Sequence, residues 1–188
     1  LGNHFNFSFA PKGISYRSNN QDTPWQLSME LAGYGTKEHQ QSMPTKKMHL
    51  DGNRVTYDRG NVQEWYVNNT AGLEQGFTLK APPSQAKANQ QIVLDIKLSG
   101  NLSPRWQQQG QSLTFYTEKG DYAFNYAKLS VIDAEGKQLP AQMALVDNNL
   151  QLSFNPENAS WPVIVDPLSY TETKLMGVDS DVEGNASF

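Results

Sequence analysis

The chain has 188 residues, of which 37% are hydrophobic and 18% are charged, with a formal net charge of −4 and no cysteine. This length suits one large β domain better than two small ones. The absence of thiols excludes a disulfide framework and cysteine-based metal sites. The scattered Lys and Arg residues argue against nucleic-acid binding, and no apolar run approaches the roughly 18 residues that a membrane-spanning helix needs.

Apolar and polar residues alternate with a period of two in several segments. The clearest examples are residues 5–9, 25–31, 92–98 and 150–154. Alternation of this kind buries one face of a strand and leaves the other face in water, which is typical of antiparallel sheets.

Short groups rich in Gly, Asn and Asp separate the alternating segments, at residues 51–53, 58–61, 118–121, 133–137 and 147–149. Gly and Asn accept the positive φ angles of tight hairpins, and no window shows convincing helical spacing. The sequence therefore predicts an all-β protein, an antiparallel β-sandwich of jelly-roll type with about a dozen strands and little or no helix.

The last core strand is expected to end at Asp166-Pro167, after which the sequence becomes polar. We expect residues 1–168 to form one sandwich domain and residues 169–188 to form a linker or the truncated start of a following repeat. Asp179, Asp181 and Glu183 resemble the start of a calcium loop, but no bidentate Glu follows them. A solvated linker is favoured, with Ca²⁺ as a candidate cofactor of the full-length protein only.

Glu64 and Glu74 form the most serious catalytic hypothesis. Both lie near aromatic residues in segments predicted to be neighbouring strands, and glycosidases use two carboxyl groups about 5–10 Å apart. The Glu-x-Asp-x-x-Glu pattern of jelly-roll glycosidases is absent, as are a nucleophile elbow and closely spaced histidines. We therefore favour a structural role for both glutamates and predict no catalytic residue.

Several aromatic residues are candidates for stacking on sugar rings, namely Trp25, Trp65, Tyr66, Trp106 and Trp161. Because a tryptophan in a sandwich usually packs into the core, at most one platform is expected. The candidate ligand-binding set from the central segment consists of Trp65, Tyr66, Glu64 and Glu74.

That central segment carries a distinctive pattern, reading Y-D-R-G-N-V-Q-E-W-Y-V-N-N-T-A-G-L-E-Q-G-F from Tyr57 to Phe77. It resembles the signature of a β domain found near the N-terminus of large exported bacterial proteins, often ahead of FG-GAP (integrin-α-like) repeats. Residues 133–141 resemble the late hairpin of that domain. Residues 161–167 resemble its closing motif, with Trp161 where Tyr is usual, and residues 184–188 resemble the opening of a first FG-GAP repeat.

The resemblance covers roughly residues 50–167 and implies an exported, multidomain, surface-associated bacterial protein. Together with the all-β pattern and the absence of a catalytic constellation in the sequence, it leads us to expect a non-enzymatic module of a secreted or cell-surface protein. Its implied partner is an adjoining repeat domain of the same chain, and a glycan or a cell-surface protein is a further candidate. Three hypotheses stay open: a structural or adhesion module, a carbohydrate-binding module, and a glycan-cleaving enzyme that uses Glu64 and Glu74.

Overall fold

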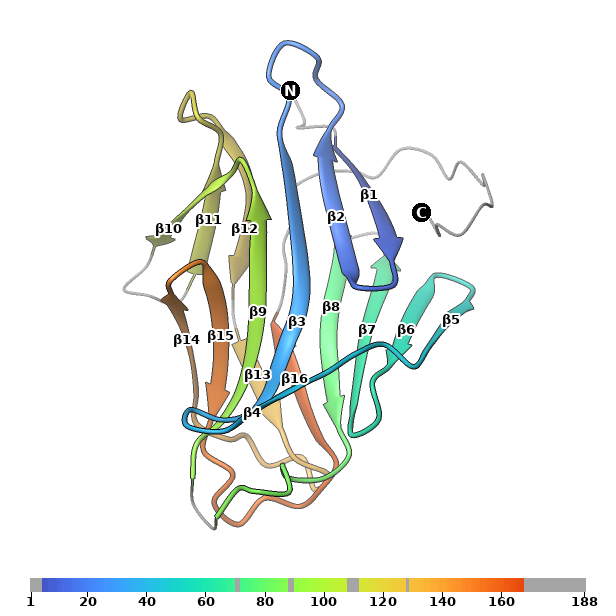
Figure 1. Ribbon diagram of the computed structural model, residues 1–188, viewed down its shortest axis with the longest axis vertical. Helices are drawn as coiled ribbons and strands as arrows, with labels where there is room; N and C mark the ends of the chain where they lie inside the picture. The colour runs from blue at the N-terminus through green and yellow to red at the C-terminus, as the bar shows by residue number, and fades with distance from the viewer. Residues whose placement is uncertain (1–4, 70–71, 88–89, 108–111, 128, 168–188) are drawn as a thin grey trace.

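The computed structural model describes residues 5–69, 72–87, 90–107, 112–127 and 129–167. Within these ranges the chain forms sixteen strands and no helix, arranged in three antiparallel sheets that do not close into a barrel (Figure 1). This confirms the predicted all-β, antiparallel sandwich. The strand count exceeds the predicted dozen because some strands, such as the three-residue β4 (Gln40–Ser42), are too short to show alternation.

Sheet A forms one layer of the sandwich, with strand order β1-β2-β3-β9-β15-β14 and with β4 also paired to β3. The long central pair β3 and β9 runs side by side from Leu27 to Thr36, with one irregularity between Leu31 and Gly33. The other bounds in this sheet are β1 (Phe5–Ala10), β2 (Gly13–Ser18), β3 (Gln26–Thr36), β9 (Ile92–Gly100), β14 (Ala141–Val146) and β15 (Asn149–Phe154).

Sheets B and C together face sheet A. Sheet B has the order β13-β16-β8-β7-β6-β5, and sheet C has the order β10-β11-β12. Their bounds are β5 (Lys47–Asp51), β6 (Arg54–Asp58), β7 (Val62–Asn69), β8 (Gly72–Leu79), β10 (Ser103–Gln107), β11 (Ser112–Tyr116), β12 (Tyr122–Ala127), β13 (Leu129–Ile132) and β16 (Val163–Pro167). Only one residue separates β12 from β13, so the chain passes directly from sheet C into sheet B.

One hydrophobic core joins all three sheets. The rings of Phe9 on β1 and Tyr66 on β7 lie 5.0 Å apart, which connects sheet A with sheet B. Tyr16 on β2 stacks on Phe124 on β12 at 5.2 Å, which connects sheet A with sheet C. Aromatic pairs of this kind contribute about 0.5–1.5 kcal/mol beyond their buried area. The buried side chains form a single cluster, so the described residues share one core.

Candidate functional site

The register of β7 and β8 determines which residues of the central segment face the core. Trp65 lies opposite Gly76, and Tyr66 lies opposite Gln75. Because successive side chains of a strand point to opposite faces, Glu64, Tyr66 and Gln75 face the core, whereas Trp65 and Gly76 lie on the outer face of sheet B. The residue before Gln75 is Glu74, which is therefore also on the outer face.

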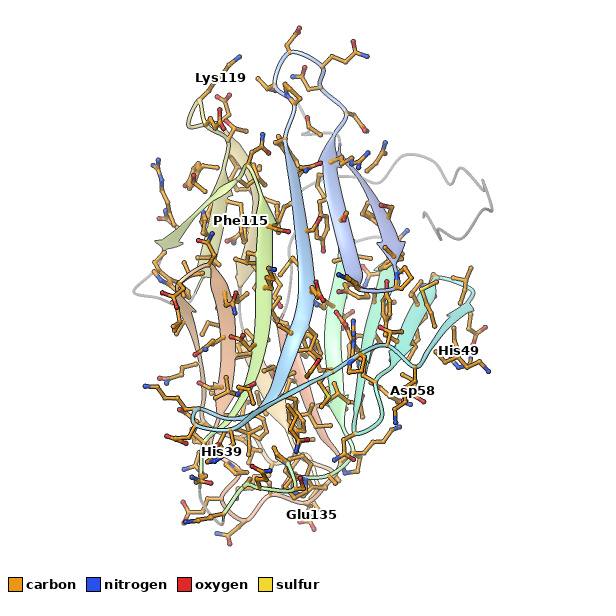
Figure 2. All side chains as sticks on the ribbon, in the orientation of Figure 1. His39, His49, Asp58, Phe115, Lys119 and Glu135 are labelled. Carbon is orange, nitrogen blue, oxygen red and sulfur yellow. The ribbon has the colours of Figure 1, made fainter. Side chains whose placement is uncertain are left out.

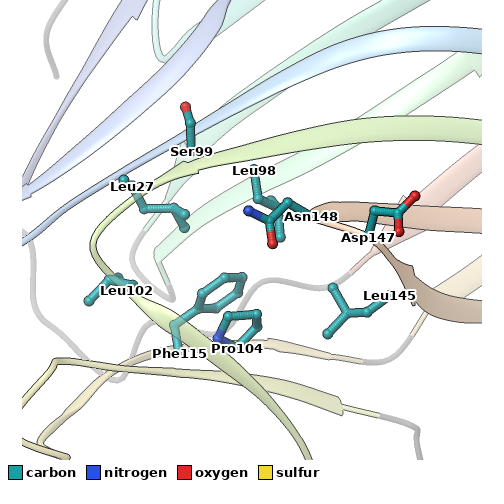
Figure 3. Close-up of a pocket in the computed structure, with 10 residues that line it drawn as sticks. Leu27, Leu98, Ser99, Leu102, Pro104, Phe115, Leu145, Asp147 and Asn148 are labelled. Carbon is teal, nitrogen blue, oxygen red and sulfur yellow. The ribbon is translucent and has the colours of Figure 1, made fainter.

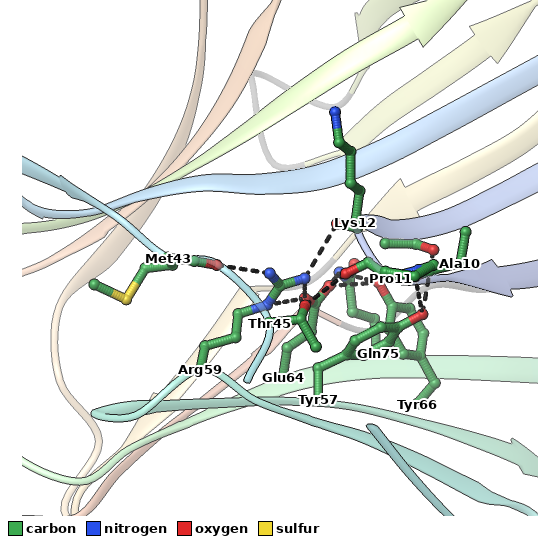
Figure 4. A network of polar contacts seen from close by, with 11 residues as sticks. Ala10, Pro11, Lys12, Met43, Thr45, Tyr57, Arg59, Glu64, Tyr66 and Gln75 are labelled. Atoms are coloured by element: carbon green, nitrogen blue, oxygen red, sulfur yellow. Dashed lines mark hydrogen bonds and ion pairs between the residues drawn. The ribbon is translucent and has the colours of Figure 1, made fainter. Parts of the chain in front are cut away.

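Glu64 lies at the centre of a buried polar network (Figure 4). Its Oε2 atom is 2.7 Å from Nη2 of Arg59, and its Oε1 atom accepts hydrogen bonds from the Tyr66 hydroxyl at 2.6 Å and from Nε2 of Gln75 at 3.2 Å. The Glu64 side chain is only 1% exposed. Charge-assisted bonds to both oxygens compensate for the cost of burying this carboxylate.

The remaining bonds of this network reach other parts of the sandwich. Arg59 donates to the carbonyl oxygens of Met43 at 2.7 Å and Lys12 at 3.1 Å. The Tyr126 hydroxyl, on sheet C, donates to Oε1 of Gln75 at 3.0 Å. The network therefore ties the β1–β2 turn, the segment before β5 and strand β12 to sheet B.

The buried position also determines the protonation state of Tyr66. Desolvation, and then the negative charge of Glu64, raise the pKa of Tyr66 well above its ordinary value. The Tyr66 hydroxyl therefore keeps its proton and remains a donor to Glu64 at any physiological pH. This arrangement is that of a satisfied structural network, in which each polar group has a partner inside the protein.

Glu74 does not join this network. It is half-buried on the outer face, where Nδ2 of Asn69 donates to its Oε2 at 3.4 Å. The structure thus places Glu64 and Glu74 on opposite faces of one sheet and does not bring their carboxyl groups to a common cleft. A two-carboxylate glycosidase mechanism needs both groups on the same side of a substrate, so this geometry gives that hypothesis no support.

Trp65 and Tyr66 both lie in packed surroundings, one on each face of sheet B as expected from their adjacency. Tyr66 is fully buried, and Trp65 is 7% exposed. The Trp65 indole lies against Gly76, is covered by the Arg54 guanidinium at 4.5 Å, and donates from Nε1 to the Thr78 hydroxyl at 3.2 Å. Neither ring presents a free face to a sugar.

The other three candidate platforms for sugar stacking differ in how far their rings are exposed to solvent. Trp25 is 8% exposed and belongs to the core, and Trp161 is part-buried with its ring 6.5 Å from that of Phe154. Trp106 is 37% exposed on β10, an edge strand of sheet C. Of the five candidates, Trp106 is the one with a substantially accessible ring.

Asp166 is a residue that sequence reasoning treated only as the end of the last core strand. Burial, followed by the charge of Glu74 and a hydrogen bond with it, raises the pKa of the Asp166 carboxyl to about 6. Its Oδ1 atom is buried and has no hydrogen-bond partner among the described residues. No local sequence signal links these two acids, because about half of the chain separates them in the sequence.

A small cavity lies between sheet A and sheet C, and the residues that line it include Leu98, Phe115, Leu145 and Asn148 (Figure 3). Its volume is about 80 Å³. Ligand pockets usually have volumes of roughly 300–1,000 Å³, so this cavity does not fit a whole sugar ring.

In the part of the chain that the structure describes, no group of three or more His, Asp or Glu side chains could hold a metal ion. His39 and His49 are exposed and lie far apart (Figure 2). His4, together with Asp179, Asp181 and Glu183, lies outside the described residues, so the calcium hypothesis stays a prediction.

Comparison with known proteins gave no match: no family model, no curated protein and no solved structure corresponds to this chain. Among the described residues, no helix has the length and apolar character to cross a membrane.

Proposed function

We propose that this β-sandwich is a non-catalytic module of a secreted or cell-surface bacterial protein, with a structural or adhesive role beside a repeat domain of the same chain. The observation that supports this proposal is the buried network around Glu64. The most distinctive segment of the sequence contributes its acid, its tyrosine and its glutamine to internal contacts.

The contacts of Glu64 favour a structural role for this residue over a catalytic one. An active-site carboxyl needs an open position beside it, whereas both oxygens of Glu64 are engaged and the side chain is 1% exposed. The pairing of Trp65 with Gly76 likewise serves packing, because the glycine leaves room for the indole. The signature that led to the resemblance is thus explained by the architecture of the sandwich.

Antibodies raised against the folded chain test the location part of this proposal. They should label intact cells of the source bacterium without permeabilisation. Labelling that appears only after lysis would contradict a secreted or surface role. Incubation of the chain with a panel of polysaccharides should release no more reducing ends than a heat-denatured sample, and sustained release would overturn the non-catalytic assignment.

A second candidate function, carbohydrate binding, is favoured by one observation. Trp106 exposes 37% of its surface on an edge strand, and Tyr122 on the same small sheet exposes 39%. Accessible aromatic rings stack on the apolar faces of sugars, and their polar edges suit the wet rim of a glycan site.

Glycan-array screening of the chain, followed by calorimetry on any hit, tests this second candidate. Trp106→Ala should weaken binding at least tenfold. Leu50→Ala is the matched control, because Leu50 is a 59% exposed apolar residue on β5 of sheet B. Equal affinity of the Trp106 variant and the unmodified chain would eliminate Trp106 as a platform.

A further inference from the structure

Glu74 and Asp166 meet on the outer face of sheet B. Strand β16 pairs with β8 through Val163 and Leu79, Ile164 and Thr78, and Val165 and Phe77. Continuing this register by one residue places Asp166 beside Gly76, with Glu74 two residues further along β8 on the same face. Two motifs far apart in the sequence therefore bring two carboxyl groups together.

The surroundings of Asp166 disfavour its charged form. Its Oδ1 atom is buried and receives no hydrogen bond from any residue that the structure describes, although an ionised carboxylate is best satisfied by donors at both oxygens. Burial, the charge of Glu74 and the hydrogen bond with Glu74 act in the same direction on the pKa of Asp166, raising it to about 6. Two carboxyl groups on adjacent strands in a partly buried position are more stable when one of them carries a proton, because two like charges would repel each other there.

Few other charges face this pair from the described elements. On β13, Ser130 lies opposite Asp166 and has no charge. On the other side, Arg54 of β6 lies beyond β7, with its guanidinium held over the Trp65 ring at 4.5 Å. From the core side, Tyr126 interacts electrostatically with Asp166, and its own raised pKa keeps it neutral.

We propose that Glu74 and Asp166 share one proton and form a pH-sensitive contact that stabilises the pairing of β8 with β16. This contact is stable in mildly acidic conditions and is weakened when the proton is lost. Strand β16 depends on this contact because its ladders are short, with three residue pairs to β8 and four to β13. Loss of the proton places two like charges on adjacent strands in a partly desolvated position, which repels β16 from β8.

The direction of the pH effect follows from linkage. The folded-state pKa of Asp166, about 6, lies above its ordinary value of 3.8, so the folded protein binds more protons than the unfolded chain between these values. The stabilisation is complete below about pH 4 and is lost as pH rises through about 6. For a shift of this size the unfolding equilibrium constant rises roughly tenfold between pH 5 and pH 8.

Carboxyl-detected NMR titration of the full chain, combined with amide hydrogen exchange at Ile164 and Val165, tests the proposal. We expect the Asp166 carboxyl to titrate near pH 6. The protection of β16, corrected for intrinsic exchange, should fall between pH 5 and pH 8. Asp166→Asn should remove this pH dependence and give the protection of the acidic form at pH 8.

Two further variants keep the test decisive. Glu74→Gln removes the partner charge and should therefore lower the pH at the midpoint of the Asp166 titration. This variant replaces Asp166→Asn in the test if Asp166→Asn does not fold. Asp147→Asn is the matched control, because Asp147 is exposed in the β14–β15 turn, and it should leave the pH dependence intact. Titration of the Asp166 carboxyl below pH 5, or equal protection of β16 at pH 5 and pH 8, would overturn the proposal.

Discussion

Arg59 and Glu64 form an ion pair of 2.7 Å inside the sandwich, where their side chains are 2% and 1% exposed. Arg59 lies in the β6–β7 turn and Glu64 on β7, so the pair closes this hairpin from the core side. The other guanidinium bonds go to the carbonyl oxygens of Lys12 and Met43. Arg59 therefore links the β6–β7 hairpin to the β1–β2 turn and to the segment that precedes β5.

Replacing Glu64 with glutamine should strongly destabilise the fold. The variant leaves the Arg59 charge buried without a counter-ion, and breaking a buried pair in this way costs about 3–5 kcal/mol. Chemical denaturation at pH 7 measures the loss. Lys80→Gln is the control, because the Lys80–Asp58 pair is 3.7 Å long and exposed, and such surface pairs contribute about 0–1 kcal/mol. Similar losses in both variants would show that the buried network does not stabilise the fold as described.

Gly76→Ala should destabilise the protein by about 1–3 kcal/mol through overpacking. A Cβ atom at this position would overlap the six-membered ring of the Trp65 indole. Near-ultraviolet circular dichroism should also change, because the indole must move away from β8. Gly33→Ala is the matched control, since its Cβ would meet the flexible end of the Gln40 side chain, which can turn aside. A larger loss in the Gly33 variant would refute this packing argument.

Much of the fold could be predicted from local pattern. Alternation identified segments that are now β1, β3, β9 and β15, because each has one face in the core and one face outside it. Trp65 and Tyr66 lie on opposite faces of β7, as adjacent residues of a strand must. The short strands could not be predicted from local pattern, since three or four residues are too few to show a period.

The roles of the acids could not be read from the sequence. Two aromatic residues, Trp65 and Tyr66, follow Glu64 directly and lie on opposite faces of the strand, so alternation alone does not reveal which face of β7 meets the core. The salt bridge to Arg59 depends on the turn geometry, and the meeting of Glu74 with Asp166 depends on pairing between distant strands. These relationships are set by tertiary structure, for which a single sequence carries no local signal.

Trp25 and Trp106 should respond very differently to truncation. Trp25 is 8% exposed, and its ring lies 5.8 Å from that of Phe5, so Trp25→Ala should cost about 3–5 kcal/mol. Trp106→Ala removes a 37% exposed ring from an edge strand and should cost less than about 1.5 kcal/mol. Denaturant midpoints of the two variants check this difference. A loss at Trp106 as large as that at Trp25 would mean that the Trp106 ring belongs to the core and not to a binding surface.

Asp133 should make the protein sensitive to acid. Its Oδ1 accepts hydrogen bonds from the backbone N–H groups of Glu135 at 3.0 Å and Lys137 at 2.9 Å, and its Oδ2 accepts one from Ser160 at 3.0 Å. These bonds, that from Ser160 first, lower the pKa of Asp133 below its ordinary value of 3.8. The carboxylate thus joins the late hairpin to the segment before β16.

A folded-state pKa below the ordinary value gives stability that is present at neutral pH and is lost as pH falls below about 4. Asp133→Asn removes the charge but keeps one acceptor oxygen, so the variant should be less stable than the unmodified chain at pH 7. Urea midpoints at pH 7 and pH 3 should show this difference shrinking in acid, because the unmodified carboxyl then approaches protonation. Asp147→Asn should show no such convergence. A difference that stays constant between the two pH values would mean that the Asp133 charge contributes nothing to holding the hairpin.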